Sequence, residues 1–360
     1  MGIYFGSNQI KQKNNQITIY NHSVINQFID RTISYFNNST IDVLNYGAFV
    51  SCSLLTEVNC PNCTSISYNA FYNCINLTTI SFPNCTIIGS SAFYNCINLT
   101  TISFPNCTII ESHAFEGCYN LVSINFPYGS IIFARAFRNC SSLTTAIFPN
   151  CSSIGTYTFF GCINLTTISF PNCIAIGYSA FRECYNLITA NFPNCSYISD
   201  EAFRYCSSLT TAIFPNCTSI GTSAFYGCFS LTTINFSNCT YISCSAFGWC
   251  KSLTTIDFPN CSYISYRAFE YCTAISIASF PICTTISYSA FRGCSMLISL
   301  YLTSVSQVPS LSTNVFYSTP IGGYTAKAGR YGSVFVPSSL YASFLTAENW
   351  SSISARIVSV

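Results

Sequence analysis

The chain has 360 residues, of which only 7% are charged, half are hydrophobic and 16% are aromatic. This composition excludes intrinsic disorder, which requires low hydrophobicity and high net charge. The net charge of +2 argues against nucleic-acid partners and polybasic membrane attachment, and no apolar run is long enough for membrane insertion.

Residues 1–32 carry no repeat but contain two short apolar stretches, Ile17–Tyr20 and Val24–Ile29. We predict an N-terminal cap here, because the end units of a repeat array must cover an exposed apolar face. The segment lacks the basic, apolar and small-residue order of a signal peptide. We therefore expect folding in the cytoplasm, and the sequence leaves open an association with a cell surface or a virion.

Residues 33–302 repeat a unit of 22 residues without insertions. Eleven equal steps predict a solenoid of about 12 coils, since each copy can then stack on its neighbour. An Ala-Phe pair marks the units, with Thr replacing Ala once, and its first residues are Ala48, Ala70, Ala92, Ala114, Ala136, Thr158, Ala180, Ala202, Ala224, Ala246, Ala268 and Ala290.

Two kinds of spacing occur within each unit. Leu77, Ile80 and Phe82 are spaced as in a short strand whose inward side chains alternate with outward ones. The following apolar positions have the i, i+4, i+5, i+8 spacing of a short helical segment and are Ile88, Ala92, Phe93 and Cys96. The expected fold is therefore an α/β solenoid, with a parallel β-sheet on one face and short helical turns on the other.

The repeat resembles that of the BspA-like leucine-rich repeat proteins, approximately L-x-x-I-x-[FL]-P followed by I-x-x-x-A-F-x-x-C-x-x-L. The residues that carry the resemblance in one unit are Leu77, Ile80, Phe82, Pro83, Ile88, Ala92, Phe93, Cys96 and Leu99. The resemblance covers about residues 33–302 and implies a leucine-rich repeat solenoid used for adhesion or protein recognition at microbial or phage surfaces. One departure is a second cysteine column, which includes Cys85 and Cys107.

Residues 303–360 break the period, because Phe316 follows Phe291 by 25 residues. A Gly-rich turn comes next, and then a predicted strand at Ser333–Val336 and a predicted helix over 338–345. We interpret this segment as a C-terminal cap. An independent binding module would need a larger core than so short a segment provides.

Twenty-two of the 24 cysteines fall in two columns, from Cys52 to Cys294 and from Cys63 to Cys283. Repeated placement predicts a cysteine-rich core of reduced thiols, since Cys behaves as a small buried hydrophobe. Disulfides between neighbouring coils stay possible on distance, because adjacent column members would lie about 5 Å apart. Cys60 and Cys63 form a C-x-x-C sequence that we interpret as core rather than as a redox or zinc pair, and Cys244 is the candidate exposed thiol.

A column of asparagines lies directly after the residue, usually proline, that ends each strand. We predict an asparagine ladder that satisfies unpaired backbone groups in the same coil and the next. Eight of its nine members begin glycosylation sequons, and glycans there would obstruct stacking, so we do not expect a glycosylating folding pathway. The members are Asn62, Asn84, Asn106, Asn150, Asn172, Asn194, Asn216, Asn238 and Asn260.

Catalytic constellations are poorly supported. The sequence has only two histidines, His22 and His113, and its glutamates lie in different units without forming a convergent pair. It also lacks the glycine motifs that bind phosphate. We therefore predict a chain that is not an enzyme and has no catalytic residues, cofactor or metal.

The remaining candidate is an interaction surface. Residue types that carry interface energy cluster on the predicted helical side, at Arg182, Arg204, Tyr205, Trp249, Arg267 and Tyr271. Outward strand positions add Ile147, Ile213 and Tyr301. These residues favour a recognition solenoid, adhesin-like or receptor-binding, whose partner is a protein or a surface glycan. The alternatives are a merely solubilising surface and a structural or scaffold protein, either phage tail-associated or intracellular.

Overall fold

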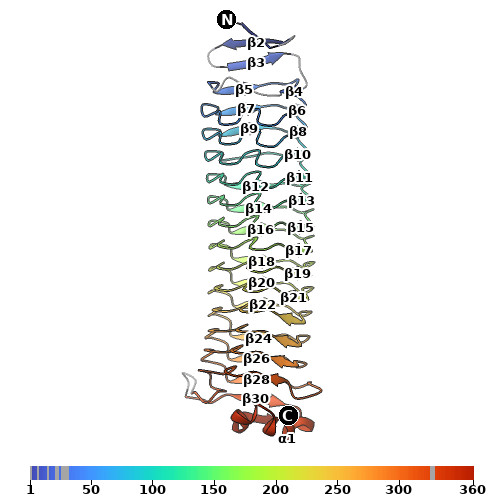
Figure 1. Ribbon diagram of the computed structural model, residues 1–360, viewed down its shortest axis with the longest axis vertical. Coiled ribbons are helices and arrows are strands. Elements are labelled where there is room, and N and C mark those ends of the chain that lie inside the picture. Colours follow the sequence, from blue (N-terminus) through green and yellow to red (C-terminus); the bar gives the residue numbers. More distant parts are fainter. Residues whose placement is uncertain (1, 6–7, 14–15, 21–23, 26–31, 325–328) are drawn as a thin grey trace. The chain divides into compact units, whose positions relative to one another are not determined.

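The computed structural model describes residues 2–5, 8–13, 16–20, 24–25, 32–324 and 329–360, with the backbone alone before residue 32. The chain divides into two compact units, Met1–Cys173 and Ile174–Val360. In both, successive coils stack, and their strands lie along two walls (Figure 1).

Unit 1 begins with three antiparallel strands, β1 (Gly2–Phe5), β2 (Asn8–Lys13) and β3 (Gln16–Tyr20). Its first wall continues with parallel strands β5 (Tyr35–Asn37), β7 (Glu57–Asn59), β9 (Thr79–Ser81), β12 (Ser123–Asn125), β14 (Thr145–Ile147) and β16 (Thr167–Ser169). Its second wall is built of two-residue parallel strands, β4 (Val24–Ile25), β6 (Val43–Leu44), β8 (Ser65–Ile66), β10 (Ile87–Ile88), β11 (Ile109–Ile110), β13 (Ile131–Ile132) and β15 (Ser153–Ile154).

Unit 2 has the same two walls. The first contains β18 (Thr189–Asn191), β20 (Thr211–Ile213), β22 (Thr233–Asn235), β24 (Thr255–Asp257), β26 (Ile277–Ser279), β28 (Ser299–Tyr301), β30 (Ser333–Val336) and β31 (Ile357–Ser359). The second contains β17 (Ala175–Ile176), β19 (Tyr197–Ile198), β21 (Ser219–Ile220), β23 (Tyr241–Ile242), β25 (Tyr263–Ile264), β27 (Thr285–Ile286) and β29 (Ser310–Leu311). Three short helices follow β30, namely η1 (Ser338–Leu340), α1 (Tyr341–Thr346) and η2 (Ser351–Arg356).

Like residues of successive coils pack on one another in each core. The register is one repeat, as in the pairing of Ile87 with Ile109. Phenylalanine rings stack within columns, with ring centroids 5.0 Å apart for Phe71 and Phe93 in unit 1 and 5.2 Å apart for Phe203 and Phe225 in unit 2. One coil has too few apolar side chains to offset its backbone entropy, so stacking supplies the stability.

The predicted helical turns do not form within the described part of residues 33–302. In one coil, the N–H groups of Ser91, Phe93 and Asn95 donate to carbonyls of the next coil. The N–H groups between them donate to carbonyls three residues back and so close four-residue turns within the coil. An α-helix needs its N–H groups for its own carbonyls, and the positive φ angles of Ser91 (54°) and Asn95 (55°) also break a helix. The α/β description is therefore corrected to a leucine-rich repeat β-solenoid with little helix.

The cysteine-rich core is confirmed, and its thiols also form hydrogen bonds. All cysteines except Cys244 are buried, and none is in a disulfide. Cys96 Sγ donates to the Phe71 carbonyl of the preceding coil at 3.2 Å, and Cys85 Sγ donates to the Ile87 carbonyl at 3.2 Å. Cys244, the predicted exposed thiol, is only half-buried and lies 3.2 Å from Ser265 Oγ.

The C-x-x-C pair lies in the core as interpreted. Cys60 and Cys63 are fully buried, and burial raises the pKa of Cys63 to about 11. Among the residues that the structure describes, no group of three or more His, Cys, Asp or Glu side chains could hold a metal ion.

The asparagine ladder is confirmed, with a different direction from the one expected. Asn84 Nδ2 donates to the Pro61 carbonyl at 2.9 Å and Asn106 Nδ2 to the Pro83 carbonyl at 2.9 Å, so each amide reaches back to the preceding coil. A second asparagine column, not predicted, includes Asn120, whose Nδ2 donates to Asn98 Oδ1 at 3.2 Å.

The chain's C-terminal segment continues the stacking before it closes. Strand β30 pairs with β28, and the Phe316 ring stacks on Phe291 with centroids 6.1 Å apart. Trp350 is fully buried beside Phe344, and its Nε1 donates to the Pro309 carbonyl at 2.7 Å. The cap boundaries at residues 32 and 302 stay predictions.

Candidate interaction surface

One edge of every coil is a row of tight turns, which we call the turn edge: residues 91–99 in one coil and their equivalents in the others. The second residue after the Phe of each Ala-Phe pair has a positive φ throughout. Its N–H donates to the next coil, as Tyr205 does to the Tyr226 carbonyl at 2.8 Å. Stacking therefore imposes a left-handed backbone that favours Gly and Asn.

The occupants of this left-handed position differ between the units. In unit 1 they are Ser51, Asn73, Asn95, Gly117, Asn139 and Gly161. In unit 2 they are Glu183, Tyr205, Gly227, Trp249, Tyr271 and Gly293. Three of the predicted surface residues, Tyr205, Trp249 and Tyr271, thus occupy this position, where a side chain other than Gly or Asn costs roughly 1–2 kcal/mol. Arg267 also has a positive φ, of 55°, at a different position of its coil.

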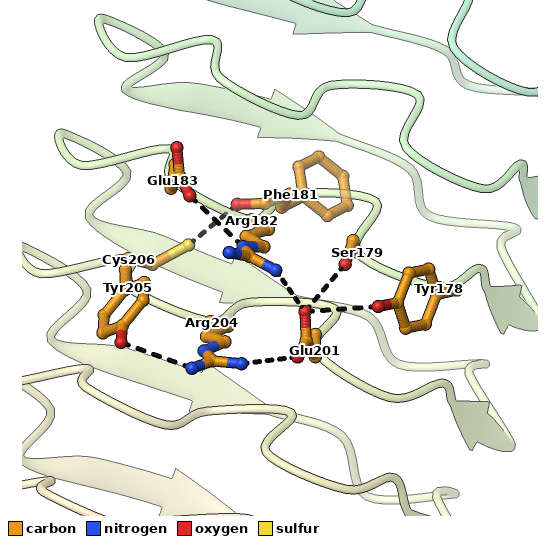
Figure 2. A network of polar contacts seen from close by, with 9 residues as sticks. All are labelled: Tyr178, Ser179, Phe181, Arg182, Glu183, Glu201, Arg204, Tyr205 and Cys206. Atoms are coloured by element: carbon orange, nitrogen blue, oxygen red, sulfur yellow. Dashed lines mark hydrogen bonds and ion pairs between the residues drawn. The ribbon is translucent and has the colours of Figure 1, made fainter.

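Glu201 brings together two predicted residues, Arg182 and Arg204 (Figure 2). Its carboxylate accepts hydrogen bonds from Nη1 of each guanidinium at 2.5 Å. Burial alone would raise the pKa of Glu201, but hydrogen bonds and charge from the two arginines outweigh it and lower the pKa. Arg182 also donates from Nε to Glu183 Oε1 at 3.2 Å. The positive charge of this cluster is therefore balanced by its own carboxylates.

Tyr205 lies against the next coil. The Arg204 guanidinium stands over the rings of Tyr205 and Tyr226, with its carbon 5.0 Å and 5.2 Å from the two centroids. A Cβ on Gly227 would come within 2.6 Å of the Tyr205 ring, so only glycine leaves room for this ring. Tyr271 covers Gly293 in the same way, at 2.4 Å.

Trp249 and Tyr271 belong to a second cluster, which we call the aromatic–lysine patch: Phe229, Trp249, Lys251 and Tyr271. The Trp249 and Tyr271 ring centroids lie 4.8 Å apart. Lys251 Nζ stands 4.7 Å from the Trp249 ring centroid and 5.5 Å from that of Phe229, which is 41% exposed. Sequence reasoning missed Phe229 and Lys251, although their separation of one repeat was a signal that they are neighbours.

Arg267 takes part in an ion-pair triad rather than in the patch. Arg267 Nε and Arg292 Nη1 each lie 3.6 Å from a carboxylate oxygen of Glu270, whose side chain is 10% exposed. Unit 1 has an equivalent triad, in which Glu116 contacts His113 and pairs with Arg138 at 3.0 Å.

The residues considered for catalysis contact other groups of the solenoid. His113 contacts Glu116, whereas the Cys118 thiol donates to the Phe93 carbonyl at 3.2 Å. His22 lies outside the described residues. Glu183 and Glu201 both pair with Arg182, and Glu201 also accepts a hydrogen bond from Ser179 Oγ at 3.3 Å.

The strand-wall candidates lie apart from the turn edge. Ile147 is on β14 in unit 1, and Ile213 and Tyr301 are on β20 and β28 in unit 2. All three are half-buried, and the Tyr301 ring stacks on Phe335 with centroids 4.6 Å apart. In the described part of the chain, no helix is both long and apolar enough to span a membrane.

The family described as "BspA type Leucine rich repeat region (6 copies)" matches residues 26–144, 130–242 and 218–329. No curated protein matches the chain. Similar solved structures include a leucine-rich repeat protein from Bacteroides ovatus, with 22% identity, a TM-score of 0.45 and coverage of 86% of this chain and 98% of that one.

A leucine-rich cell surface protein from Faecalibacterium prausnitzii is also similar, with 22% identity, a TM-score of 0.38 and coverage of 88% of this chain and 92% of that one. The pneumococcal vaccine antigen PcpA has 13% identity, a TM-score of 0.44 and coverage of 100% and 97%. Because the family match extends over most of the sequence, the chain belongs to the BspA-type leucine-rich repeat family.

Proposed function

We propose that this chain is a non-enzymatic recognition protein that binds another protein through the turn edge of unit 2. Leucine-rich repeat proteins of this family commonly act at surfaces or in protein interactions. An adhesin-like or receptor-binding role follows if the partner is displayed on a cell. The proposal rests above all on the large side chains at the left-handed positions of Tyr205, Trp249 and Tyr271.

The fold accepts Asn or Gly at the same position in unit 1, so stacking does not require an aromatic ring there. Backbone strain that the fold does not need is typical of functional sites. Trp, Tyr and Arg are also the residue types that dominate binding energy at protein interfaces.

Binding to an array of matrix proteins, cell-surface proteins and glycans tests the proposal. The variant carries Tyr205→Asn, Trp249→Asn and Tyr271→Asn together, which keeps residues suited to a positive φ. Its matched control carries Tyr72→Asn and Tyr94→Asn, which removes two stacked surface tyrosines of unit 1.

We expect the triple variant to lose at least about 100-fold in affinity for a protein that the wild type binds, since central aromatic residues each contribute about 2 kcal/mol or more. The control variant should bind as the wild type does. Equal binding by the triple variant and the wild type would contradict the proposal, as would binding that is confined to glycans.

A further inference from the structure

We infer that the aromatic–lysine patch binds an acidic peptide segment of the partner, with carboxylates paired to Lys251 and apolar side chains against Phe229. This inference rests on the proposed function and specifies the chemistry of the partner.

Lys251 is the cation that this patch leaves available. Among the described residues, its ammonium has no ion pair with a carboxylate, whereas Arg182, Arg204, Arg267 and Arg292 all have one. The side chain is exposed, and its ammonium is positioned over two aromatic rings. Neighbouring apolar rings reduce the surrounding water and so strengthen a Coulomb interaction with an arriving carboxylate.

The charges around the patch are also unbalanced. On the turn edge from Trp249 to Arg292, three cations accompany a single carboxylate, that of Glu270. Both of its arginine partners stand at 3.6 Å, farther than the 2.5 Å contacts of Glu201. The Glu201 cluster is neutral, with two arginines and two glutamates, so negative charge on a partner is drawn to the Lys251 end of the turn edge.

The aromatic rings favour a peptide over a glycan as the source of that charge. Sugars stack on free ring faces, but the Trp249 ring is contacted by Lys251 and by Tyr271. The Tyr271 ring covers Gly293 and is approached by Arg292, whose guanidinium carbon is 5.9 Å from its centroid. Ring edges and the exposed Phe229 remain, and apolar peptide side chains pack against such surfaces.

Fluorescence anisotropy with the full chain tests this inference. The probe is a short labelled peptide of alternating Glu and Phe. The comparison ligands are the same peptide with Gln in place of Glu, and polygalacturonate as an anionic polysaccharide. Lys251→Gln removes the proposed charge, Lys251→Arg keeps it, and Arg135→Gln in unit 1 removes a cation that also stands over a ring.

We expect the acidic peptide to bind more tightly than the Gln peptide and to weaken as salt is added. Lys251→Gln should reduce its affinity about tenfold, while Lys251→Arg and Arg135→Gln leave the affinity near that of the wild type. Equal binding of the two peptides, no effect of Lys251→Gln, or binding of polygalacturonate alone would overturn the inference.

The two proposals can fail separately. One outcome is that a partner found on the array fails to bind the Tyr205, Trp249 and Tyr271 triple variant and still binds Lys251→Gln at full affinity. In that case the turn edge is the binding surface, and the inference of an acidic peptide segment is wrong. If the triple variant retains the partner, the proposed function itself is wrong.

Discussion

The same backbone position carries different side chains in the two units of this solenoid. In unit 1 the left-handed position two residues after each Phe of an Ala-Phe pair is occupied by Asn, Gly or Ser, with φ angles of about 55–75°. The other left-handed position of the coil, that of Ser91, carries His113, Arg135 and Tyr157 in the same unit and is not part of this comparison. In unit 2, Tyr205, Trp249 and Tyr271 adopt φ angles of 63°, 64° and 57°. Both units have the same hydrogen bonds to the next coil, so folding alone does not account for the aromatic residues. Asn, Gly or Ser is enough for stacking at this position, and we attribute the aromatic residues of unit 2 to binding.

The largest expected effect concerns the core that both units share. Burial raises the pKa of Cys63 and Cys151 from 9.0 to about 11, and that of Cys107 and Cys217 to about 12. Above pH 9 the unfolded chain releases these protons first, so stability falls as pH rises toward the folded-state pKa values. Each thiol contributes a slope of about 1.4 kcal/mol per pH unit.

Circular dichroism against pH, with reductant present, measures this loss. We expect one steep alkaline transition that begins near pH 9. Both units should unfold in it, since the thiols are distributed along both. A protein that keeps its spectrum and its unfolding midpoint to pH 12 would show that the cysteine columns are not buried as described.

A second prediction compares two glycines of the turn edge. Gly227 lies one repeat after the large Tyr205, and Gly161 lies one repeat after the smaller Asn139. Gly227→Ala should lower the free energy of unfolding by about 2–3 kcal/mol, because the new Cβ meets both a positive φ and the Tyr205 ring at 2.6 Å. Gly161→Ala meets the same kind of positive φ but only the end of the flexible Asn139 side chain, so about 1–2 kcal/mol is expected. Chemical denaturation measures both values, and adding Tyr205→Asn should recover part of the loss at Gly227. A loss at Gly161 as large as at Gly227 would argue against the ring contact.

A reciprocal exchange tests the cost of the left-handed position directly. Asn95→Trp in unit 1 should lower the free energy of unfolding by about 1–2 kcal/mol. Trp249→Asn in unit 2 should change it by less than about 1 kcal/mol, since relief of backbone strain offsets the lost ring contact with Tyr271. Denaturant titrations of the two variants provide the test. If Trp249→Asn is the more destabilising change, the aromatic ring is part of the folding energetics and the comparison between the units fails.

The smallest effect is expected at Glu201. Its lowered pKa means that its stabilising contribution is present above the unfolded-state pKa and is lost as pH falls through the folded-state pKa. The cluster is partly open to solvent, so Glu201→Gln should cost only about 0.5–1 kcal/mol at neutral pH. The difference from the wild type should shrink in acid, as denaturation at neutral and acidic pH would show. A difference that grows as pH falls would contradict the assigned ion pairs.

Much of the solenoid could be predicted because the 22-residue period places like residues in contact. The buried columns that contain Phe93 and Cys96, and the ladder that contains Asn84, follow from that period. The helical turns were wrongly predicted because the spacing from Ile88 to Cys96 suits one face of either a helix or a turn. What decides between them is hydrogen bonding to the next coil, which a pattern within one repeat does not contain.

The candidate surface was predicted only in part for a similar reason. Residue type alone pointed to Tyr205, Trp249 and Tyr271, but their strain became visible only with the backbone angles. Lys251 was missed, because its position over Trp249 depends on how the turn directs its side chain.

Hydrogen–deuterium exchange of the full chain, with and without a protein partner from the binding array, tests the central claim most directly. Binding should slow exchange on the turn edge of unit 2, over residues 201–209 and 245–253, and leave residues 91–99 of unit 1 unchanged. Protection confined to the strand walls or to unit 1, with residues 201–209 and 245–253 exchanging as before, would contradict the account.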